Sequence, residues 1–309
     1  MAKYLVTGGA GFIGSHLVDR LLKDGHEVVV IDDFSLGKKE NLTSHKNLVV
    51  YKKSICENLD KFFSSNRFDA VFHLAALPRV QFSIAYPRES HEANINGTLN
   101  LLLATRDHGV KRFIYSSSSS VYGDQKKLPL VETMMPDPMS PYAFQKLAGE
   151  YYCRLFAKLY GLETISLRYF NVYGPRQNPD GAYAGQIPKF FSKLLAGETP
   201  VINGDGTQTR DNTFVSDVVE ANLASLGGST PQWGESFNIG GGHNHSVNET
   251  TRQILKLTGS KIKPKHGPAV IEPRDTLANV SKAKKILGWT PKTRYEDGLA
   301  LTYEYFTER

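Results

Sequence analysis

The sequence contains only two cysteines, Cys56 and Cys153, among 309 residues. Two cysteines cannot form a disulfide framework or a cysteine-rich metal site, so both are excluded. No apolar run is long enough to span a membrane, and no signal-peptide pattern precedes the first strand-like run. These absences predict a cytoplasmic protein that has no membrane partner.

Positive charge is in slight excess but is not concentrated anywhere. The formal net charge is +6, yet the lysines are scattered in small groups and no nucleic-acid-binding module accompanies them. We therefore expect no nucleic-acid partner, while a mild positive field suits an anionic small-molecule substrate. Hydrophobic residues make up 40% and charged residues 22% of a chain long enough for one large α/β domain or two smaller ones.

Three glycines near the start of the chain, Gly8, Gly11 and Gly14, have the spacing G-x-x-G-x-x-G. A strand-like run at Lys3–Val6 precedes them, an apolar pattern of helical period follows, and a second strand-like run occupies His26–Ile31. Glycine there lets the chain turn tightly, lets a pyrophosphate approach and lets the helix pack closely on the strand. The alternative is a glycine-rich turn that binds nothing.

An acidic residue closes the second of these strand-like runs. Asp32 stands at the position where the carboxylate of a dinucleotide-binding unit can accept hydrogen bonds from both ribose hydroxyls. The same carboxylate would repel a 2′-phosphate. The sequence therefore predicts NAD, not NADP, as the cofactor.

Strand-like and helical patterns alternate from Lys3 to Leu167, which predicts an α/β fold of the Rossmann type with a doubly wound parallel sheet. We expect an NAD-binding domain over residues 1–170. After Asn171 the chain becomes rich in Gly, Asn, Asp and Pro, as in binding loops. Residues 171–309 are predicted to form a smaller C-terminal α/β domain for the substrate, with some segments returning to the first domain. The expected strands are Leu48–Tyr51, Ala70–Leu74, Phe113–Tyr115 and Thr164–Leu167, and the expected helices are Glu92–Asp107, Pro141–Leu159, Val247–Leu257 and Ser281–Leu287.

Two Tyr-x-x-x-Lys pairs occur, Tyr122–Lys126 and Tyr142–Lys146. The first lies in an expected turn, so a structural role is predicted for Tyr122. The second follows Ser140-Pro141, which is typical of a helix start, so that Tyr142 and Lys146 share one helix face. We expect the ammonium to lower the pKa of the phenol, which could then accept a proton from a sugar hydroxyl.

Five consecutive serines, in FIYSSSSSVYGD, follow an expected strand. Serine runs are more often linkers, but this one begins at the end of a buried strand, where parallel sheets bind ligands. Among the histidines, His73 ends a strand-like run and is expected to be a hydrogen-bonded core residue. His243 and His245 have loop spacing that could suit a metal, but no further ligands lie close in the sequence, so no metal site is predicted.

Together these motifs resemble the extended short-chain dehydrogenase/reductase family, and most closely its UDP-sugar 4-epimerases. The resemblance covers essentially the whole chain and includes TGGAGFIG, Asp32, SSS-x-x-VYG, SPYAFQK, RYFNVYGPR, GDGTQTRD and SKAKKILGW. RQNPDGAYAGQIPKF and LPLVE are similar to the branch that accepts N-acetylated UDP-hexosamines. The resemblance of the whole chain implies an isomerase that oxidises the sugar transiently at C4 with bound NAD, and it implies a homodimer.

The resemblance also implies roles for individual residues. Ser118 would hydrogen-bond the reacting sugar oxygen, Tyr142 would take or return the proton, and Lys146 would hold the nicotinamide ribose. The residues implied to bind NAD are Gly8, Gly11, Phe12, Ile13, Gly14, Asp32, Asp33, Ser35, Gly37, Ile55, Leu74, Ala75, Ala76, Asn94, Tyr142, Lys146 and Tyr169. Those implied to bind the UDP-sugar are Ser118, Ser119, Asn171, Gln177, Gly185, Val201, Asn203, Arg210, Arg274 and Thr276.

Three of the substrate residues have more specific expectations. Arg210 is expected to pair with the UDP phosphates, or alternatively with Asp211. Thr276 falls where side-chain size varies next to the sugar in this family, although a surface threonine before a helix is the simpler interpretation. Arg274 is expected to replace an arginine that the family has shortly before the position of Glu272.

Several functions share these motifs. The 4,6-dehydratases of the family carry an Asp-Glu pair where this chain has Ser119 and Ser120, which argues against a dehydratase because a hydroxyl cannot do that acid/base work. UDP-glucuronate 4-epimerase and UDP-glucuronate decarboxylase remain alternatives. An NAD-binding module without catalysis is a third, which intact Ser118, Tyr142 and Lys146 speak against.

Overall fold

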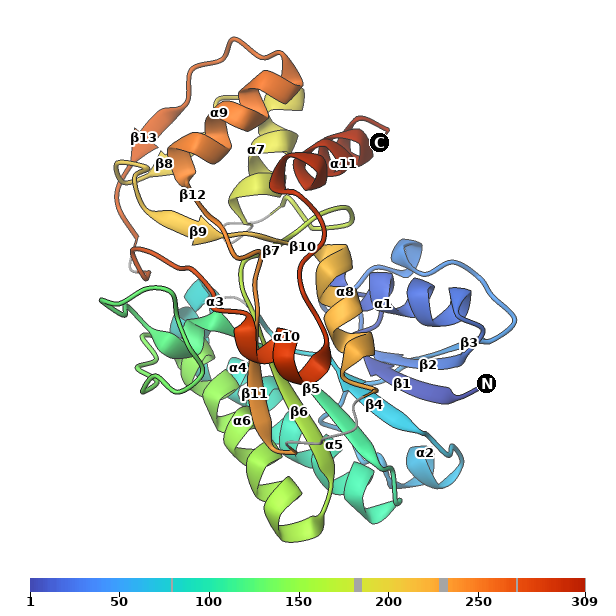
Figure 1. Cartoon of the computed structure of the whole chain (residues 1–309). Coiled ribbons are helices and arrows are strands. Elements are labelled where there is room, and N and C mark those ends of the chain that lie inside the picture. Colours follow the sequence, from blue (N-terminus) through green and yellow to red (C-terminus); the bar gives the residue numbers. More distant parts are fainter. Residues whose placement is uncertain (79, 181–184, 228–232, 271, 309) are drawn as a thin grey trace.

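A computed structural model describes residues 1–78, 80–180, 185–227, 233–270 and 272–308 of the chain (Figure 1). Residues 181–184, which belong to one of the expected binding loops, lie outside the described residues. Within the described ranges, no helix is both long enough and apolar enough to cross a membrane.

A seven-stranded parallel sheet forms the centre of the molecule, with the strand order β11-β6-β5-β4-β1-β2-β3. The strand order reverses between β1 and β4, because β2 and β3 follow on one side of β1 and β4 to β6 on the other. This doubly wound arrangement confirms the predicted Rossmann-type fold. The strands are β1 (Lys3–Thr7), β2 (Glu27–Asp32), β3 (Leu48–Lys52), β4 (Ala70–His73), β5 (Arg112–Ser118), β6 (Glu163–Tyr169) and β11 (Glu235–Ile239).

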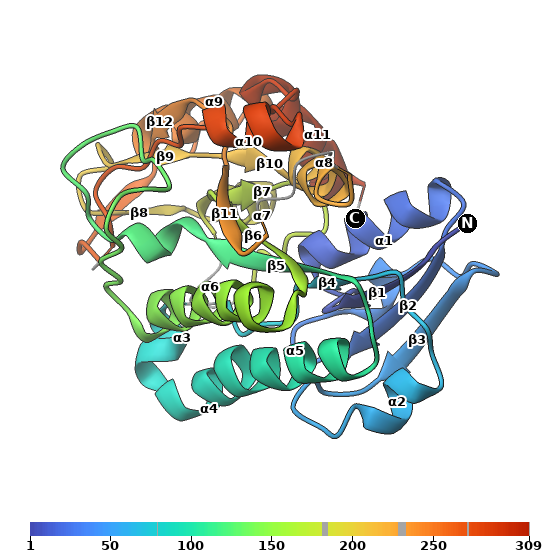
Figure 2. The same cartoon turned by 60° about the horizontal axis from the view of Figure 1, so that its bottom comes forward.

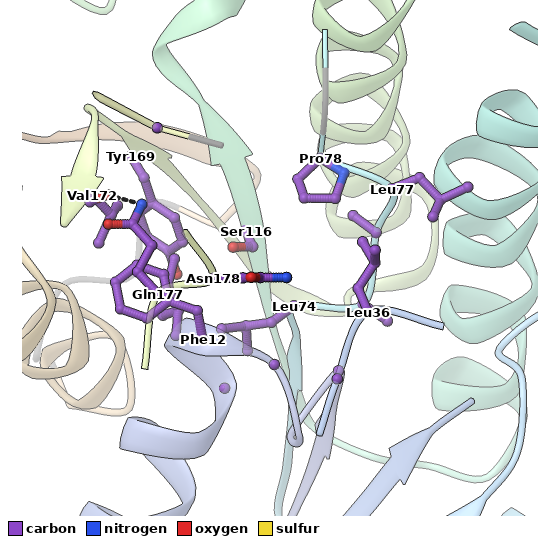
Figure 3. Close-up of a pocket in the computed structure, with 18 of the residues that line it drawn as sticks. Phe12, Leu36, Leu74, Leu77, Pro78, Ser116, Tyr169, Val172, Gln177 and Asn178 are labelled. Atoms are coloured by element: carbon purple, nitrogen blue, oxygen red, sulfur yellow. Dashed lines mark hydrogen bonds between the residues drawn. The ribbon is translucent and has the colours of Figure 1, made fainter. Parts of the chain in front are cut away.

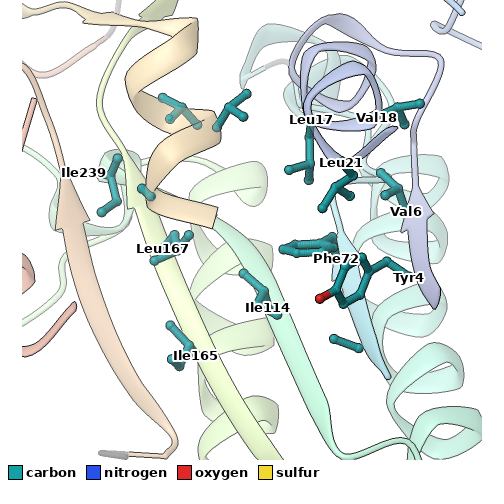
Figure 4. Packing of buried hydrophobic residues seen from close by; sticks show 14 of the residues in the cluster. Tyr4, Val6, Leu17, Val18, Leu21, Phe72, Ile114, Ile165, Leu167 and Ile239 are labelled. Atoms are coloured by element: carbon teal, nitrogen blue, oxygen red, sulfur yellow. The ribbon is translucent and has the colours of Figure 1, made fainter. Parts of the chain in front are cut away.

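Helices cover both faces of this sheet (Figure 2). On one face, α1 (Phe12–Lys23), α8 (Val215–Ala224) and α10 (Ser281–Leu287) close one buried apolar cluster, part of which Figure 4 shows. A second cluster fills the other face under α2 (Asp60–Ser64), α5 (Gly97–Asp107) and α6 (Pro141–Tyr160). The other helices of this part, α3 (Val80–Ala85), α4 (Pro87–His91) and the π-helical turn η2 (Glu92–Asn96), pack against α6.

A smaller part of the molecule lies beyond the carboxyl ends of the strands (Figure 1). Its core is a third apolar cluster between α7, α9 and α11. The chain does not stay in this part, because α8, β11 and α10 return to the main sheet. Its elements are β7 (Val172–Tyr173), α7 (Gln186–Leu195), β8 (Val201–Asn203), β9 (Thr209–Asp211), β10 (Thr213–Phe214), β12 (Asn244–Ser246), α9 (Val247–Thr258), β13 (Lys265–Gly267) and α11 (Tyr295–Thr307).

Local sequence signals explain where α6 begins and ends. The Ser140 side chain accepts a hydrogen bond from the backbone N–H of Ala143, and Pro141 occupies the first turn. Gly161 ends the helix in a left-handed conformation with φ 69°. The expected helix over Pro141–Leu159 is thereby confirmed, and Tyr142 stands in its first turn.

Candidate active site

A cavity of about 970 Å³ lies at the carboxyl edge of the sheet, where the strand order reverses between β1 and β4 (Figure 3). One wall is formed by the turns after β1, β2, β4 and β5. The facing wall comes from the smaller part, including Val172, Gln177 and Asn178. This is the place where open α/β sheets bind dinucleotides.

The glycines after β1 shape the floor of this cavity. Gly8 has φ +68°, and a Cβ on Gly14 would lie 2.2 Å from the carbonyl oxygen of Gly8. Helix α1 begins at Gly11 without a side-chain cap, so its first N–H groups are left to a ligand. A helix start with free N–H groups and no side chains in the way fits the diphosphate of a dinucleotide.

Asp32 stands at the end of β2, on the next wall of the cavity. Its carboxylate accepts hydrogen bonds from the backbone N–H groups of Ala10 (2.9 Å) and Phe34 (2.8 Å), and burial raises its pKa. A Cβ on Gly37 would lie 2.7 Å from one carboxylate oxygen, so a side chain at position 37 would crowd the carboxylate and glycine does not. Asp32 lines the cavity, where the sequence predicts it as the acceptor for ribose hydroxyls. Together with the glycine turn, it makes the cavity fit NAD.

Ser118, Tyr142 and Lys146 meet deeper in the cavity. Ser118 ends β5, while the other two lie one turn apart on α6. The Lys146 ammonium donates a hydrogen bond to the carbonyl oxygen of Ser116 (2.7 Å) and lies 6.0 Å from the centre of the Tyr142 ring. Ser118 lies near enough to the Tyr142 phenol to lower its pKa. The predicted constellation is therefore assembled at one point.

The pKa of Tyr142 departs from the prediction. Burial raises it to about 12, and the neighbouring Ser118 side chain lowers it by less. The pKa of Lys146 falls to about 7, because burial disfavours its charge. The expectation that Lys146 lowers the phenol pKa was therefore wrong for the protein without cofactor. Both residues are buried, and the loss of water outweighs their mutual influence.

The serine run is part of the cavity wall and not a linker. Ser116 to Ser120 all line the cavity, and β5 continues through Ser118, further than the expected Tyr115. The Ser118 hydroxyl oxygen accepts hydrogen bonds from the backbone N–H (3.2 Å) and the hydroxyl (2.9 Å) of Ser120, which lies in a short 3-10 helix, η3 (Ser119–Tyr122). The Ser118 hydroxyl is thereby held in place.

Most of the residues implied by the resemblance line the cavity, and four do not. Asn94 is buried, and its amide bonds the backbone N–H and carbonyl of Leu77, so it supports a cavity loop from behind. Val201 and Asn203 lie on β8, away from the cavity lining. The Arg274 guanidinium donates to the Thr207 hydroxyl (2.8 Å) and is not among the residues that line the cavity, so its role at the diphosphate stays a prediction.

The other substrate residues gather at the end of the cavity in the smaller part. Arg210 forms an ion pair with Glu272 (2.7 Å) and not with Asp211, so the alternative pairing is corrected. The Asp211 carboxylate instead accepts backbone N–H groups, including that of Ala278 at 2.9 Å. Thr276 is 7% exposed and its hydroxyl accepts a hydrogen bond from the Asp211 N–H (3.2 Å), so it is not a surface threonine.

Two residues outside the site take the structural roles expected for them. His73 is buried between the hydroxyls of Thr7 (2.8 Å) and Thr98 (2.9 Å), and burial lowers its pKa to about 3. Tyr122 is buried as well, and its hydroxyl donates to the Asn238 side chain (2.7 Å). The Tyr122–Lys126 pair is therefore not part of the cavity.

Sequence reasoning missed a basic residue in the cavity wall. Arg176 lines the cavity near α1 and pairs with Asp19 of that helix (2.6 Å). Its other terminal nitrogen, Nη1, is buried without a hydrogen-bond partner among the described residues. The backbone of Arg176 has φ 64°, which a pattern of residue types does not reveal. It adds positive charge to this wall of the cavity.

The chain is similar to known proteins along its whole length. Residues 4–240 match the NAD dependent epimerase/dehydratase family. The solved structure of UDP-glucose 4-epimerase with UDP-glucose from Thermotoga maritima is 43% identical, covers 99% of each chain and has a TM-score of 0.95. UDP-N-acetylglucosamine 4-epimerase from Methanobrevibacter ruminantium, in complex with UDP-N-acetylmuramic acid, is 38% identical over 99% of this chain and 98% of its own, with a TM-score of 0.94. UDP-glucuronic acid 4-epimerase from Bacillus cereus, with UDP-glucuronic acid and NAD, is 36% identical over 99% of each chain, with a TM-score of 0.92.

The chain belongs to the NAD-dependent epimerase/dehydratase family, within the extended short-chain dehydrogenases/reductases. Its relatives place it among the UDP-sugar 4-epimerases, which are isomerases. NAD is its cofactor, as the predicted glycine turn and Asp32 indicate.

Proposed function

We propose that this protein interconverts gluco- and galacto-configured UDP-hexoses, including UDP-N-acetylglucosamine and UDP-N-acetylgalactosamine. The observation that carries the proposal is the meeting of Ser118, Tyr142 and Lys146 in a cavity whose lining includes two small side chains. Ser119 and Thr276 both line that cavity. Neither would fill the space that a 2-acetamido group needs beside the sugar ring.

The reaction moves one proton and one hydride at C4 of the sugar. When bound, NAD would supply the hydride acceptor and the hydride that returns, so the cofactor would be unchanged after each turnover. Tyr142 takes the proton of the C4 hydroxyl, and Ser118 hydrogen-bonds the same oxygen and holds it toward the phenol. After the 4-keto sugar has turned over in the cavity, the hydride would be added to the opposite face of C4, and Tyr142 returns the proton to the same C4 oxygen.

Tyr142 needs a cation close by before it can accept a proton. A phenol with a pKa of about 12 is almost wholly protonated at neutral pH. Lys146 is the cation that this chain supplies on the same helix, 6.0 Å from the centre of the Tyr142 ring. It can lower the pKa of the phenol only once the bound cofactor and substrate change the burial that dominates both pKa values in the protein without ligands. Arg210 lies at the UDP end of the cavity, where its guanidinium can bind the diphosphate once it exchanges its ion pair with Glu272.

UDP-glucuronate is the second candidate substrate, either for 4-epimerisation or for decarboxylation. Arg176 favours it, because this cavity-lining guanidinium has a buried nitrogen without a partner among the described residues and could meet a uronate carboxylate. The similarity to the Bacillus cereus enzyme supports this alternative equally. An NAD-binding module without catalysis would have no need of the three assembled catalytic groups.

We also propose that the enzyme is a homodimer in the cytoplasm. Helix α6 carries exposed apolar residues at helical spacing, among them Phe144, Tyr151, Leu155 and Leu159, and an apolar stripe of this kind suits packing against a second copy. The low cysteine content agrees with a reducing compartment. Light scattering after size exclusion tests the dimer, and a monomer mass would contradict it.

Proton NMR tests the proposed function directly. The purified protein is incubated without added NAD in separate tubes with UDP-N-acetylglucosamine, UDP-glucose and UDP-glucuronate. Formation of the galacto-configured product is expected in the first two tubes, and the fastest tube identifies the preferred sugar. A pentose product from UDP-glucuronate would assign the protein as a decarboxylase. No change in any tube, even after NAD is added, would refute the epimerase proposal.

A further inference from the structure

A buried carboxylate lies directly behind the proposed catalytic groups. Glu150 is on α6, one helical turn after Lys146, and is only 6% exposed. Its first oxygen accepts hydrogen bonds from the Ser117 hydroxyl and from Nε of Arg168 (2.9 Å). Its second oxygen accepts from Nη2 of Arg168 (2.7 Å) and from the Ser236 hydroxyl (3.0 Å). Glu150 does not line the cavity, so it does not act on a ligand directly.

These partners come from three neighbouring strands. Ser117 is on β5, Arg168 on β6 and Ser236 on β11, and these strands are adjacent in the sheet. In the strand register, Ser117 pairs with Arg168, and Ser236 lies opposite Ser166. One carboxylate on the helix therefore holds three strands at the level where they approach the cavity.

The same network reaches the turn that follows Ser118. The Arg168 guanidinium lies over the ring of Tyr122, 4.7 Å from its centre, and the Tyr122 hydroxyl donates to Asn238 on β11. Tyr122 ends η3, the short helix that begins immediately after Ser118. The segment on both sides of the Ser118 hydroxyl is therefore tied to the Glu150–Arg168 pair.

Stability alone is a poor explanation of such a pair, because buried ion pairs often stabilise a fold no better than apolar residues of the same volume. A fixed distance between two elements is what the network supplies. Ser117 directly precedes Ser118, and Glu150 follows Tyr142 by two turns of the same helix. Reacting groups lose activity steeply when they are displaced, by about 100-fold for about 1 Å.

We propose that Glu150 is a positioning residue for epimerisation, which holds the strand end that carries Ser118 at a fixed distance from the helix that carries Tyr142 and Lys146. This inference rests on the proposed function. The Ser117 hydroxyl is the link through which the carboxylate acts on β5, because it is the β5 side chain that donates a hydrogen bond to Glu150. The Ser236 hydroxyl donates an equivalent hydrogen bond to Glu150, but Ser236 is on β11, which carries none of the proposed catalytic groups.

The two serines provide a matched pair of variants. Ser117→Ala and Ser236→Ala each remove one hydroxyl from the same carboxylate and leave its ion pair with Arg168 intact. Replacement of Glu150 itself is less informative, because it would leave the Arg168 charge buried without its partner. Both serine variants are expected to fold and to lose similar amounts of thermal stability.

Kinetics with the preferred UDP-sugar separate positioning from stability. We expect Ser117→Ala to lower kcat by about 10- to 100-fold with KM within about twofold of wild type, because substrate binding groups stay in place. Ser236→Ala is expected to keep kcat within about twofold. Equal kcat values for the two variants, or a loss that appears in KM alone, would overturn the proposal. Inactivity of the wild-type protein on all three UDP-sugars would instead refute the proposed function.

Discussion

The two Tyr-x-x-x-Lys pairs allow a direct test of which tyrosine is chemical and which is structural. Both tyrosines are buried, and Tyr→Phe removes a single hydroxyl at each position. The Tyr142 hydroxyl lies in the cavity with Ser118, whereas the Tyr122 hydroxyl donates to the Asn238 side chain at 2.7 Å. Tyr142→Phe should therefore lose activity, and Tyr122→Phe should lose stability.

The expected magnitudes follow from these contacts. Loss of a positioned proton acceptor costs about 10²- to 10⁴-fold in rate, so Tyr142→Phe should lower kcat by that factor. Its unfolding temperature should change little, because burial of the free phenol is itself unfavourable. Tyr122→Phe leaves the Asn238 carbonyl buried without its donor, at a cost of about 1–3 kcal/mol. At about 2–4 °C per kcal/mol, the unfolding temperature should fall by roughly 2–12 °C.

Scanning calorimetry and the NMR assay measure the two effects on the same samples. The expected result is an inactive but stable Tyr142→Phe and an active but less stable Tyr122→Phe, each compared with wild type at equal NAD content. If both variants kept full activity, Tyr142 would not be the proton acceptor. If Tyr122→Phe lost activity without loss of stability, the role of this tyrosine as a support would be refuted.

Three further predictions concern the cofactor and the buried lysine. Gly14→Ala should copurify without NAD, because its Cβ would lie 2.2 Å from the Gly8 carbonyl oxygen; normal NAD content in the absorbance spectrum would contradict this. Asp32→Asn should weaken NAD binding by about 10- to 100-fold in calorimetric titration, since a hydrogen bond to a charged group contributes about 1.5–3 kcal/mol; unchanged affinity would refute the ribose role. Burial lowers the pKa of Lys146 to about 7 from 10.5, so between these values the unfolded chain binds more protons and stability rises with pH. Lys146→Met should lack this rise between about pH 7 and pH 9.5 in urea unfolding of the cofactor-free protein, and a parallel pH dependence of variant and wild type would argue against it.

The parts of the fold that could be predicted from the sequence are those specified by neighbouring residues. The elements β1, α1 and α6 were predicted from their apolar patterns and from the residues that mark turns and helix starts, which are Gly8, Gly14 and Ser140-Pro141. Each of these signals lies within or beside the element itself. β11 was not predicted, since its partner in the sheet is β6, which lies far earlier in the chain. Long-range pairing of this kind leaves little trace in the local pattern.

The site shows the same division. Motif spacing brought Ser118, Tyr142 and Lys146 together correctly, because strand ends and helix starts meet at one edge of a parallel sheet. The direction of a side chain in a loop was less predictable. Arg274 stands close to Thr276 in the sequence yet bonds Thr207 outside the cavity, and only the geometry reveals it. The pKa of Tyr142 depends on how much water is excluded, which no spacing in the sequence encodes.

The repeated return of the chain to the main sheet limits how this enzyme can change its substrate. After β6 the chain leaves for β7 to β10, comes back as α8 and β11, leaves again for β12 to β13, and comes back as α10 before α11. A cut at residue 170 would remove the edge strand β11 and uncover the apolar cluster beneath α8 and α10. The smaller part is therefore not a module that recombination could exchange whole. New specificities have to arise by substitutions and insertions within its loops, while α8 and α10 of the same chain continue to cover the main sheet.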